Sequence, residues 1–209
     1  LNSQLYDGFL KSFNKTAPAL PQKPNEASTW MQHFQKLNES EKFLREFNPN
    51  NLNLSSIDTV YVGDVPNDTL VITGNYTHAG PIFVFNDGVL IFDNATVVDS
   101  GDIYVFQNGQ MFADSTSFTF PQEYFYQRSL FAVNNGSIHV TNSSFNYSGW
   151  SHNLFLAQNA TVYFENIHQN DWTTCGVNGN SSITIKNCNI TGEYILTDTS
   201  SSTFINADT

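Results

Sequence analysis

Hydrophobic and polar residues alternate along most of this chain in short runs that end at small or polar residues. Ile103-Tyr-Val-Phe106 is one such run, and Met111-Phe-Ala-Asp114 follows it after the turn-forming residues Gln107-Asn-Gly109. A period of two predicts a β-strand with one buried face, and Gly, Asn and Asp are typical of the turns between strands. From about residue 58 onward, the pattern therefore predicts many short strands.

The first part of the chain has a different pattern. Apolar residues at helical spacing, and the prolines that interrupt them, are Leu5, Phe9, Leu10, Phe13, Pro18, Pro21, Pro24, Trp30, Phe34, Leu37, Phe43, Leu44 and Phe47. Ser28 or Thr29 is a suitable N-cap for the second helix. We expect residues 1–57 to form a helical N-terminal segment that packs on or caps the β-rich part, residues 58–209.

The β-rich part is an internal repeat anchored on a small residue. The anchors are Gly88, Gly109, Gly136, Ala160, Ser181 and Ser202, with gaps of 21, 27, 24, 21 and 21 residues. Positions six and four residues before each anchor, and two and four after it, are mostly apolar. A repeat of this length made of strands predicts a solenoid, because one coil alone cannot bury its apolar face.

A polar column accompanies the repeat six residues after each anchor. Its members are Asn94, Ser115, Asn142, Asn166, Asn187 and Asp208. We expect these side chains to stack inward at a turn, hydrogen-bonding one another and the backbone. Residues 68–209 thereby resemble the right-handed parallel β-helix (pectin-lyase-like) superfamily. The resemblance implies an all-β, right-handed parallel β-helix solenoid of about six coils.

Two further columns point away from the predicted interior. The first begins with Phe83, Tyr104, Phe131 and Phe155, and the second begins with Phe85 and Phe106. Such a large apolar stripe is unusual on the surface of a monomer. We expect the N-terminal helices to cover it. The alternatives are an aromatic platform for sugar rings and an oligomerisation surface, for which the solenoid edge is a second candidate.

Two lengthened coils bring aromatic and polar residues together on one side of the predicted solenoid. Their offsets from the anchors align Tyr126, Arg128, Trp150, His152, Asp171 and Trp172. Rings that cover the C–H faces of sugars, beside polar groups that bind hydroxyls or carboxylates, are typical of glycan sites. This cluster is the predicted ligand-binding site. The alternative is that these aromatic residues only pack over the edge of the coils.

Catalytic candidates are fewer. Asp93 and Asp114 fall at the same outward position of successive coils, close enough for a retaining glycosidase pair. His152 with Asp171 has the residue types of a base and its orienting carboxylate. The resemblance implies polysaccharide hydrolases or lyases as one functional class, but no motif of those enzymes maps onto this chain.

The charge balance excludes some partners. Eight Lys and Arg stand against nineteen Asp and Glu, a formal net charge of −11, which argues against binding nucleic acid. No apolar run approaches the roughly 18 residues of a membrane span. Cys175 and Cys188 lack the number and spacing of a disulfide framework or a metal site, so neither a metal nor a cofactor is predicted. Cys175, in an inward column, is predicted to be a core thiol.

Twelve Asn-x-Ser/Thr triplets occur in the chain, for example at Asn75, Asn135 and Asn159. They indicate either N-glycosylation or the composition of an Asn-, Ser- and Thr-rich repeat. The chain begins at Leu1 without Met, and we expect a secreted or cell-surface protein. The favoured function is a non-enzymatic, adhesin-like module that binds a glycan or an extracellular protein, and a carbohydrate-active enzyme is the alternative.

Overall fold

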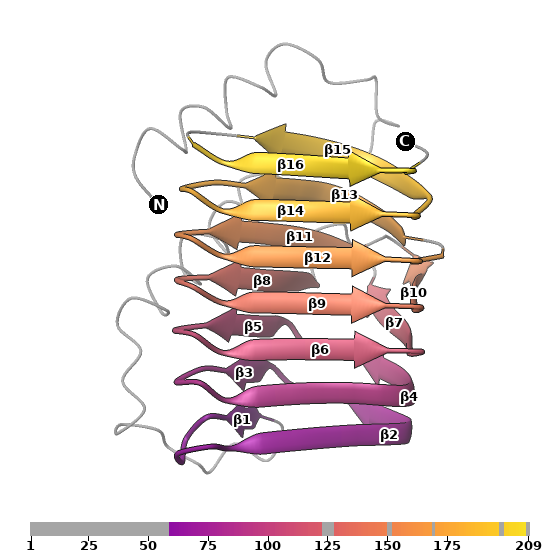
Figure 1. Cartoon of the computed structure of the whole chain (residues 1–209). Helices are drawn as coiled ribbons and strands as arrows, with labels where there is room; N and C mark the ends of the chain where they lie inside the picture. Colours follow the sequence, from indigo (N-terminus) through magenta and orange to yellow (C-terminus); the bar gives the residue numbers. More distant parts are fainter. Residues whose placement is uncertain (1–58, 123–127, 150–151, 169, 197–198, 208–209) are drawn as a thin grey trace, which may run out of the picture. The chain divides into compact units, whose positions relative to one another are not determined.

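The computed structural model describes residues 59–122, 128–149, 152–168, 170–196 and 199–207. These residues form an all-β parallel solenoid of about six coils, which confirms the predicted fold class (Figure 1). No helix occurs within these ranges, and none of the described residues belongs to a helix suited to crossing a membrane. The predicted N-terminal helices, residues 1–57, lie outside the described residues.

Two parallel sheets run the length of the stack. Sheet A contains β1 (Val60–Val62), β3 (Ile82–Val84), β5 (Ile103–Phe106), β8 (Ser129–Val133), β11 (His152–Ala157), β13 (Asn170–Val177) and β15 (Ile190–Leu196), in that order. Sheet B contains β2 (Thr69–His78), β4 (Val89–Asp99), β6 (Gln110–Asp114), β7 (Ser117–Gln122), β9 (Ser137–Thr141), β10 (Ser144–Gly149), β12 (Thr161–Glu165), β14 (Ser182–Lys186) and β16 (Ser201–Ile205). The second half of β4 pairs with the second half of β2 on one side and with β7 on the other, and β7 pairs with β10. These segments form a third face of the solenoid.

Each coil passes from sheet A to sheet B through a tight turn that the sequence specifies locally. Gln107 and Asn108 both have positive φ, and the Gly109 N–H donates to the Phe106 carbonyl at 2.9 Å, as in a type I′ turn. Asn adopts this left-handed conformation more readily than most residues. A Cβ at Gly109 would lie 2.2 Å from the Val84 oxygen of the preceding coil, which explains why the anchor must be small.

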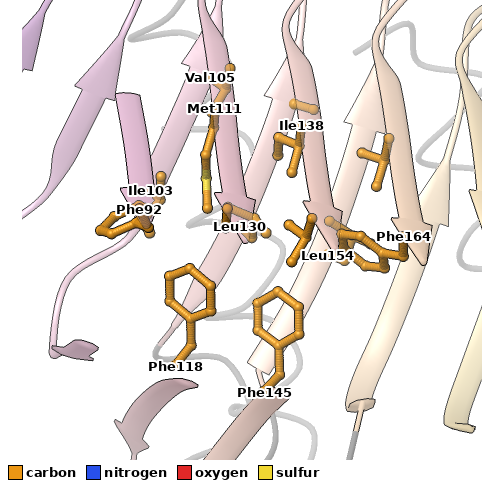
Figure 2. Close-up of a cluster of buried hydrophobic side chains, with 14 of the residues drawn as sticks. Phe92, Ile103, Val105, Met111, Phe118, Leu130, Ile138, Phe145, Leu154 and Phe164 are labelled. Carbon is orange, nitrogen blue, oxygen red and sulfur yellow. The ribbon is translucent and has the colours of Figure 1, made fainter. Parts of the chain in front are cut away.

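The interior is a stack of buried hydrophobic side chains from the predicted inward columns (Figure 2). Ile103, Leu130 and Leu154 are register partners on successive strands of sheet A and are at most 1% exposed. Phe118 and Phe145, from β7 and β10, stack with ring centroids 5.1 Å apart. Cys175 continues the column of Leu154 as a buried free thiol, as predicted, and burial raises its thiol pKa.

The polar column forms a hydrogen-bonded ladder, but the prediction that it points inward is wrong. Asn166 donates to Asn142 at 2.9 Å, Asn187 to Asn166 at 3.2 Å and Asn206 to Asn187 at 3.3 Å, all on the outside of the stack. Each ladder residue has positive φ, and this bend keeps its side chain outside. The next residue turns inward instead, and this inward column is Ala95, Thr116, Ser143, Ile167 and Cys188.

The register of the last coil also differs from the prediction. Ser182 pairs with Ser201 and Cys175 with Tyr194, so the anchor is Ser200 rather than Ser202. This coil is therefore two residues shorter than predicted, and its ladder residue is Asn206. Asp208, the predicted ladder residue, lies outside the described residues.

The predicted outer aromatic column of sheet A is a continuous ring stack. Tyr61, Phe83, Tyr104, Phe131 and Phe155 follow one another with ring centroids 5.6, 4.9, 4.7 and 5.5 Å apart. They alternate with the inward residues of the same strands and do not belong to the interior cluster. We call this row the sheet A ring row. Its central members Phe83, Tyr104 and Phe131 are nevertheless only 7, 8 and 3% exposed, whereas Tyr61 and Phe155 at its ends are half-buried.

Candidate functional site

The outer face of sheet B carries a row of apolar and aromatic side chains. These residues occupy the third position after the anchor in successive coils and are in register across β2, β4, β6, β9 and β12. We call them the apolar row: Val71, Ile91, Phe112, His139 and Tyr163. Val71 is 55% exposed and Phe112 37% exposed. The rings of Phe112 and His139 lie 6.1 Å apart, and those of His139 and Tyr163 lie 4.6 Å apart and stack. The apolar row therefore offers open hydrophobic faces to solvent.

A second row, two residues further along the same strands and continued on β14, is polar, and half of its members are acidic. This acid row contains Thr73, Asp93, Asp114, Thr141, Glu165 and Lys186. Asp114 accepts hydrogen bonds from Thr141 Oγ1 at 2.5 Å and Asn142 Nδ2 at 2.8 Å. Hydrogen bonds from Thr141 and then Asn142 lower the pKa of Asp114, so this exposed carboxyl stays ionised at neutral pH.

The two rows are joined at their far end by a hydrogen-bonded ion pair. Tyr163 donates to Glu165 at 2.7 Å, and Lys186 Nζ lies 2.6 Å from the other oxygen of Glu165. The hydrogen bond from Lys186, followed by that from Tyr163, lowers the pKa of Glu165, so this carboxyl is also ionised. Because Lys186 neutralises Glu165, the uncompensated negative charge of the acid row lies nearer to Asp93 and Asp114.

A shallow groove of about 250 Å³ runs between the two rows. It is lined by Val71, Ile91, Phe92, Asp93, Phe112, Ala113, Asp114, His139 and Thr141. This volume is below the roughly 300–1,000 Å³ of pockets that enclose a small molecule. The groove is therefore shaped to contact one side of a ligand rather than to surround it.

Two catalytic candidates from the sequence lie at this groove. Asp93 and Asp114 are register partners on β4 and β6, exposed on the outer face as predicted. Asp93 accepts a hydrogen bond from Asn94 Nδ2 at 2.7 Å. Both carboxylates are thus held by neighbouring donors on one wall of the groove.

His152, predicted at the glycan-binding cluster, is not on the surface. Its side chain is 1% exposed, and its ring centroid lies 5.2 Å from Phe120 and 5.0 Å from Phe145. Neither ring nitrogen has a hydrogen-bond partner, and burial lowers its pKa to about 4. The expectation that His152 lines the outside is wrong, because the chain enters β11 with this residue on the inward side. Nor does its unpartnered ring fit a base oriented by Asp171.

The other predicted cluster residues are only partly described. Trp172 pairs with His152 along sheet A, and Asp171 pairs with Thr191, so the backbone brings Trp172 beside β11 as expected. Arg128 is half-buried, and its backbone N–H donates to Gln122 Oε1 at 3.0 Å. Tyr126 and Trp150 lie outside the described residues. A ligand-binding role for this side of the solenoid stays a prediction.

A buried carboxyl lies apart from the groove, at the end of β4. Asp99 is 0% exposed, and one of its oxygens accepts the Gly101 N–H at 2.9 Å while the other has no hydrogen-bond partner. Burial raises the pKa of Asp99 to about 6, opposed by the Gly101 N–H and by the nearby His78 and Arg128. In the described chain, Asp99 is the acidic residue whose protonation is most favoured.

The apolar row was not identified from the sequence. Its members lie between inward positions, where Val, Ile, Phe and Tyr also occur simply because they favour strands. The available signal was the third position after the anchor, which is apolar or aromatic at Ile91, Phe112 and Tyr163 and becomes Thr at Thr184 and Thr203.

Searches of protein-family models, curated proteins and solved structures returned no match to this chain. Within the residues that the structure describes, no three His, Cys, Asp or Glu side chains come together as a metal site would require.

Proposed function

We propose that this chain is a non-enzymatic glycan-binding module whose ligand lies on the outer face of sheet B. The observation that carries the proposal is the groove between the apolar row and the acid row. Phe112 and His139 offer apolar surface to sugar C–H groups, while Asp93, Asp114 and Thr141 offer oxygen atoms to hydroxyl groups. This is the pairing that the sequence suggested for a glycan site, at a different place on the solenoid.

The ionised state of the carboxyl groups favours glycan binding over glycoside hydrolysis. Glycoside hydrolysis requires one carboxylic acid with a raised pKa beside a carboxylate. Hydrogen bonds lower the pKa of Asp114 and of Glu165, so both lack the proton that an acid would donate. Asp99 has a raised pKa but is buried elsewhere in the coil.

The proposed setting is extracellular or on the cell surface, with an adhesin-like role. A hydrogen-bonded solenoid with a groove that crosses four coils of one face suits attachment to a polymer or to a glycosylated partner. The proposal also includes kinship with the right-handed, pectin-lyase-like β-helices, which rests on the repeat and the asparagine ladder.

A glycan array tests this function. Phe112→Thr should abolish array binding without changing the melting temperature, because Thr184 and Thr203 already occupy the same column in later coils. Tyr147→Thr is the matched control, since Tyr147 is an exposed aromatic residue of β10 on the third face. Asp114→Asn should weaken binding, because it replaces the ionised acceptor.

Two results would contradict the proposal. Binding that survives Phe112→Thr but is lost on Arg128→Ala would place the ligand on the insertion side. Release of reducing sugars or unsaturated products from polysaccharides, abolished by Asp93→Asn with Asp114→Asn, would show that the protein is an enzyme.

A further inference from the structure

The groove on sheet B runs across the strands, along the axis of the solenoid. Its lining residues come from four successive coils, in β2, β4, β6 and β9. Neighbouring parallel strands are about 4.8 Å apart, so four coils span about 14 Å along this axis. A ligand that fills the groove must therefore be extended in that direction.

The surface of the groove repeats with the coil. Each coil contributes one member of the apolar row, which is Val71, Ile91, Phe112 and then His139. The opposite wall repeats in parallel with Asp93, Asp114 and Thr141 from β4, β6 and β9, and Thr73 is the register partner of Asp93 on β2. A repeating surface matches a repeating ligand, in which every unit meets the same pair of an apolar face and an oxygen acceptor.

The charge of the groove restricts the class of polymer. Among the described residues, two carboxyl groups line the groove and no Lys or Arg does, and Lys186 is paired with Glu165 further along the acid row. An anionic polymer such as a polyuronate would place carboxylates against Asp93 and Asp114 with no neutralising cation, which is unfavourable. Neutral sugars donate hydroxyl hydrogens to these carboxylates without that repulsion.

We propose that the ligand is a linear, uncharged polysaccharide that lies along the solenoid axis, with one sugar residue over each coil from β2 to β9. This inference rests on the proposed function and adds the direction, length and charge class of the ligand. A pyranose ring in an extended chain covers roughly one coil spacing, so the groove holds about four residues. The apolar row contacts the ring faces, and Asp93 and Asp114 accept hydrogen bonds from ring hydroxyls.

Calorimetry with oligosaccharides of one to six units, from β-1,4-linked glucose, mannose and xylose, tests the direction and the length. In at least one series, affinity should rise at least tenfold between one and four units and then stay constant. Val71→Thr, at the end of the groove, should leave the shortest ligands unaffected and shorten the saturating length by one unit. Phe112→Thr, near the middle, should weaken binding of every length, and Tyr147→Thr should change nothing.

The charge class is tested with polygalacturonate and its fully methyl-esterified form as competitors. The esterified polymer should compete for the groove and the free acid should not. The double variant Asp93→Asn with Asp114→Asn should reduce this difference in competition between the two polymers. Stronger competition by the free acid overturns the charge assignment.

Other outcomes separate this inference from the proposed function. Equal affinity for two and six units, still lost in Phe112→Thr, overturns the axial arrangement and leaves glycan binding intact. If the protein binds none of the three series but still binds glycans on the array in a way that depends on Phe112, only the proposed polymer class is overturned. No binding on the array overturns the proposed function as well.

Discussion

Two ionisable side chains are buried in the coil with pKa values shifted in opposite directions. His152 is buried between Phe120 and Phe145, with its pKa lowered to about 4. Asp99 is buried at the end of β4, with its pKa raised to about 6. Both side chains are therefore neutral in the folded state between about pH 4 and 6. Their effects on stability oppose each other over that range.

We predict that His152→Phe increases stability in acid. The pKa of His152 in the folded state is below the roughly 6.5 of an unfolded chain, so the unfolded state binds more protons between about pH 4 and 6.5. Stability is therefore lost as the pH falls through that range, by about 2 kcal/mol at pH 5. Urea unfolding should show the variant gaining stability over the wild type at pH 5 relative to pH 7.5. A constant difference between the two proteins would mean that His152 is hydrated.

Asp99→Asn should have the opposite dependence on pH. The pKa of Asp99 in the folded state lies above the roughly 3.9 of an unfolded chain, so stability falls as the pH rises from about 4 to 6 and is constant above. An amide resembles the protonated carboxyl, and the Gly101 N–H can still donate to its oxygen. The variant should therefore be more stable than the wild type at pH 7.5, by up to about 3 kcal/mol, with the gain disappearing near pH 4. A variant that is less stable at pH 7.5 would show that the carboxylate is stabilised by His78 or Arg128.

At the scale of one turn, the asparagine ladder combines a backbone requirement with side-chain hydrogen bonds. Asn166 has a φ of +55°, donates to Asn142 and accepts from Asn187. Asn166→Leu should cost about 1–2 kcal/mol, since Leu disfavours the left-handed conformation and the hydrogen bonds are lost. Asn166→Gly should cost about half as much, because Gly adopts positive φ freely. Thermal unfolding measures both variants, and equal losses would show that the backbone conformation is not the cause.

The strands and their inward residues could be predicted because a strand has a period of two. Ile103 and Val105 are inward for this reason alone. The direction of Asn142 could not be predicted, since a left-handed residue at a bend interrupts the alternation and moves the inward position to Ser143. The sequence predicts Ser202 as the anchor of the last coil instead of Ser200, because the two residues are chemically identical and Ser202 continues the 21-residue period.

At the scale of the whole molecule, the sequence predicts that the N-terminal segment completes the fold. Residues 1–57 carry apolar residues at helical spacing, and the sheet A ring row, Tyr61 to Phe155, is a long apolar surface whose central rings are buried. Deleting residues 1–50 should therefore cause self-association, measured by light scattering during gel filtration. In the truncated protein, Phe83→Thr with Phe131→Thr should restore a monomer. A truncated chain that stays monomeric and equally stable would contradict the prediction.

The repeat in the sequence places some residues of the candidate site but not others. Asp93 and Asp114 could be placed outward on neighbouring coils because their offset from the anchor is the same. His152 could not be placed, since the lengthened coils precede it and an insertion shifts the alternation by an unknown number of residues. The apolar row and the acid row could be recognised only from the register of sheet B, which aligns Phe112 with His139 and Asp114 with Thr141.

The final coil differs from those before it, and this has a consequence for how the stack comes apart. Phe204 and Ile205 are 41 and 43% exposed, whereas Ile185, the partner of Phe204 on β14, is fully buried. In a solenoid each coil is stabilised only by its neighbours, so opening is cheapest where a coil buries little apolar area. Among the described coils this is the coil of β16, which we expect to detach before β14 under tension. The Phe-rich coils around β7 and β10 should detach last.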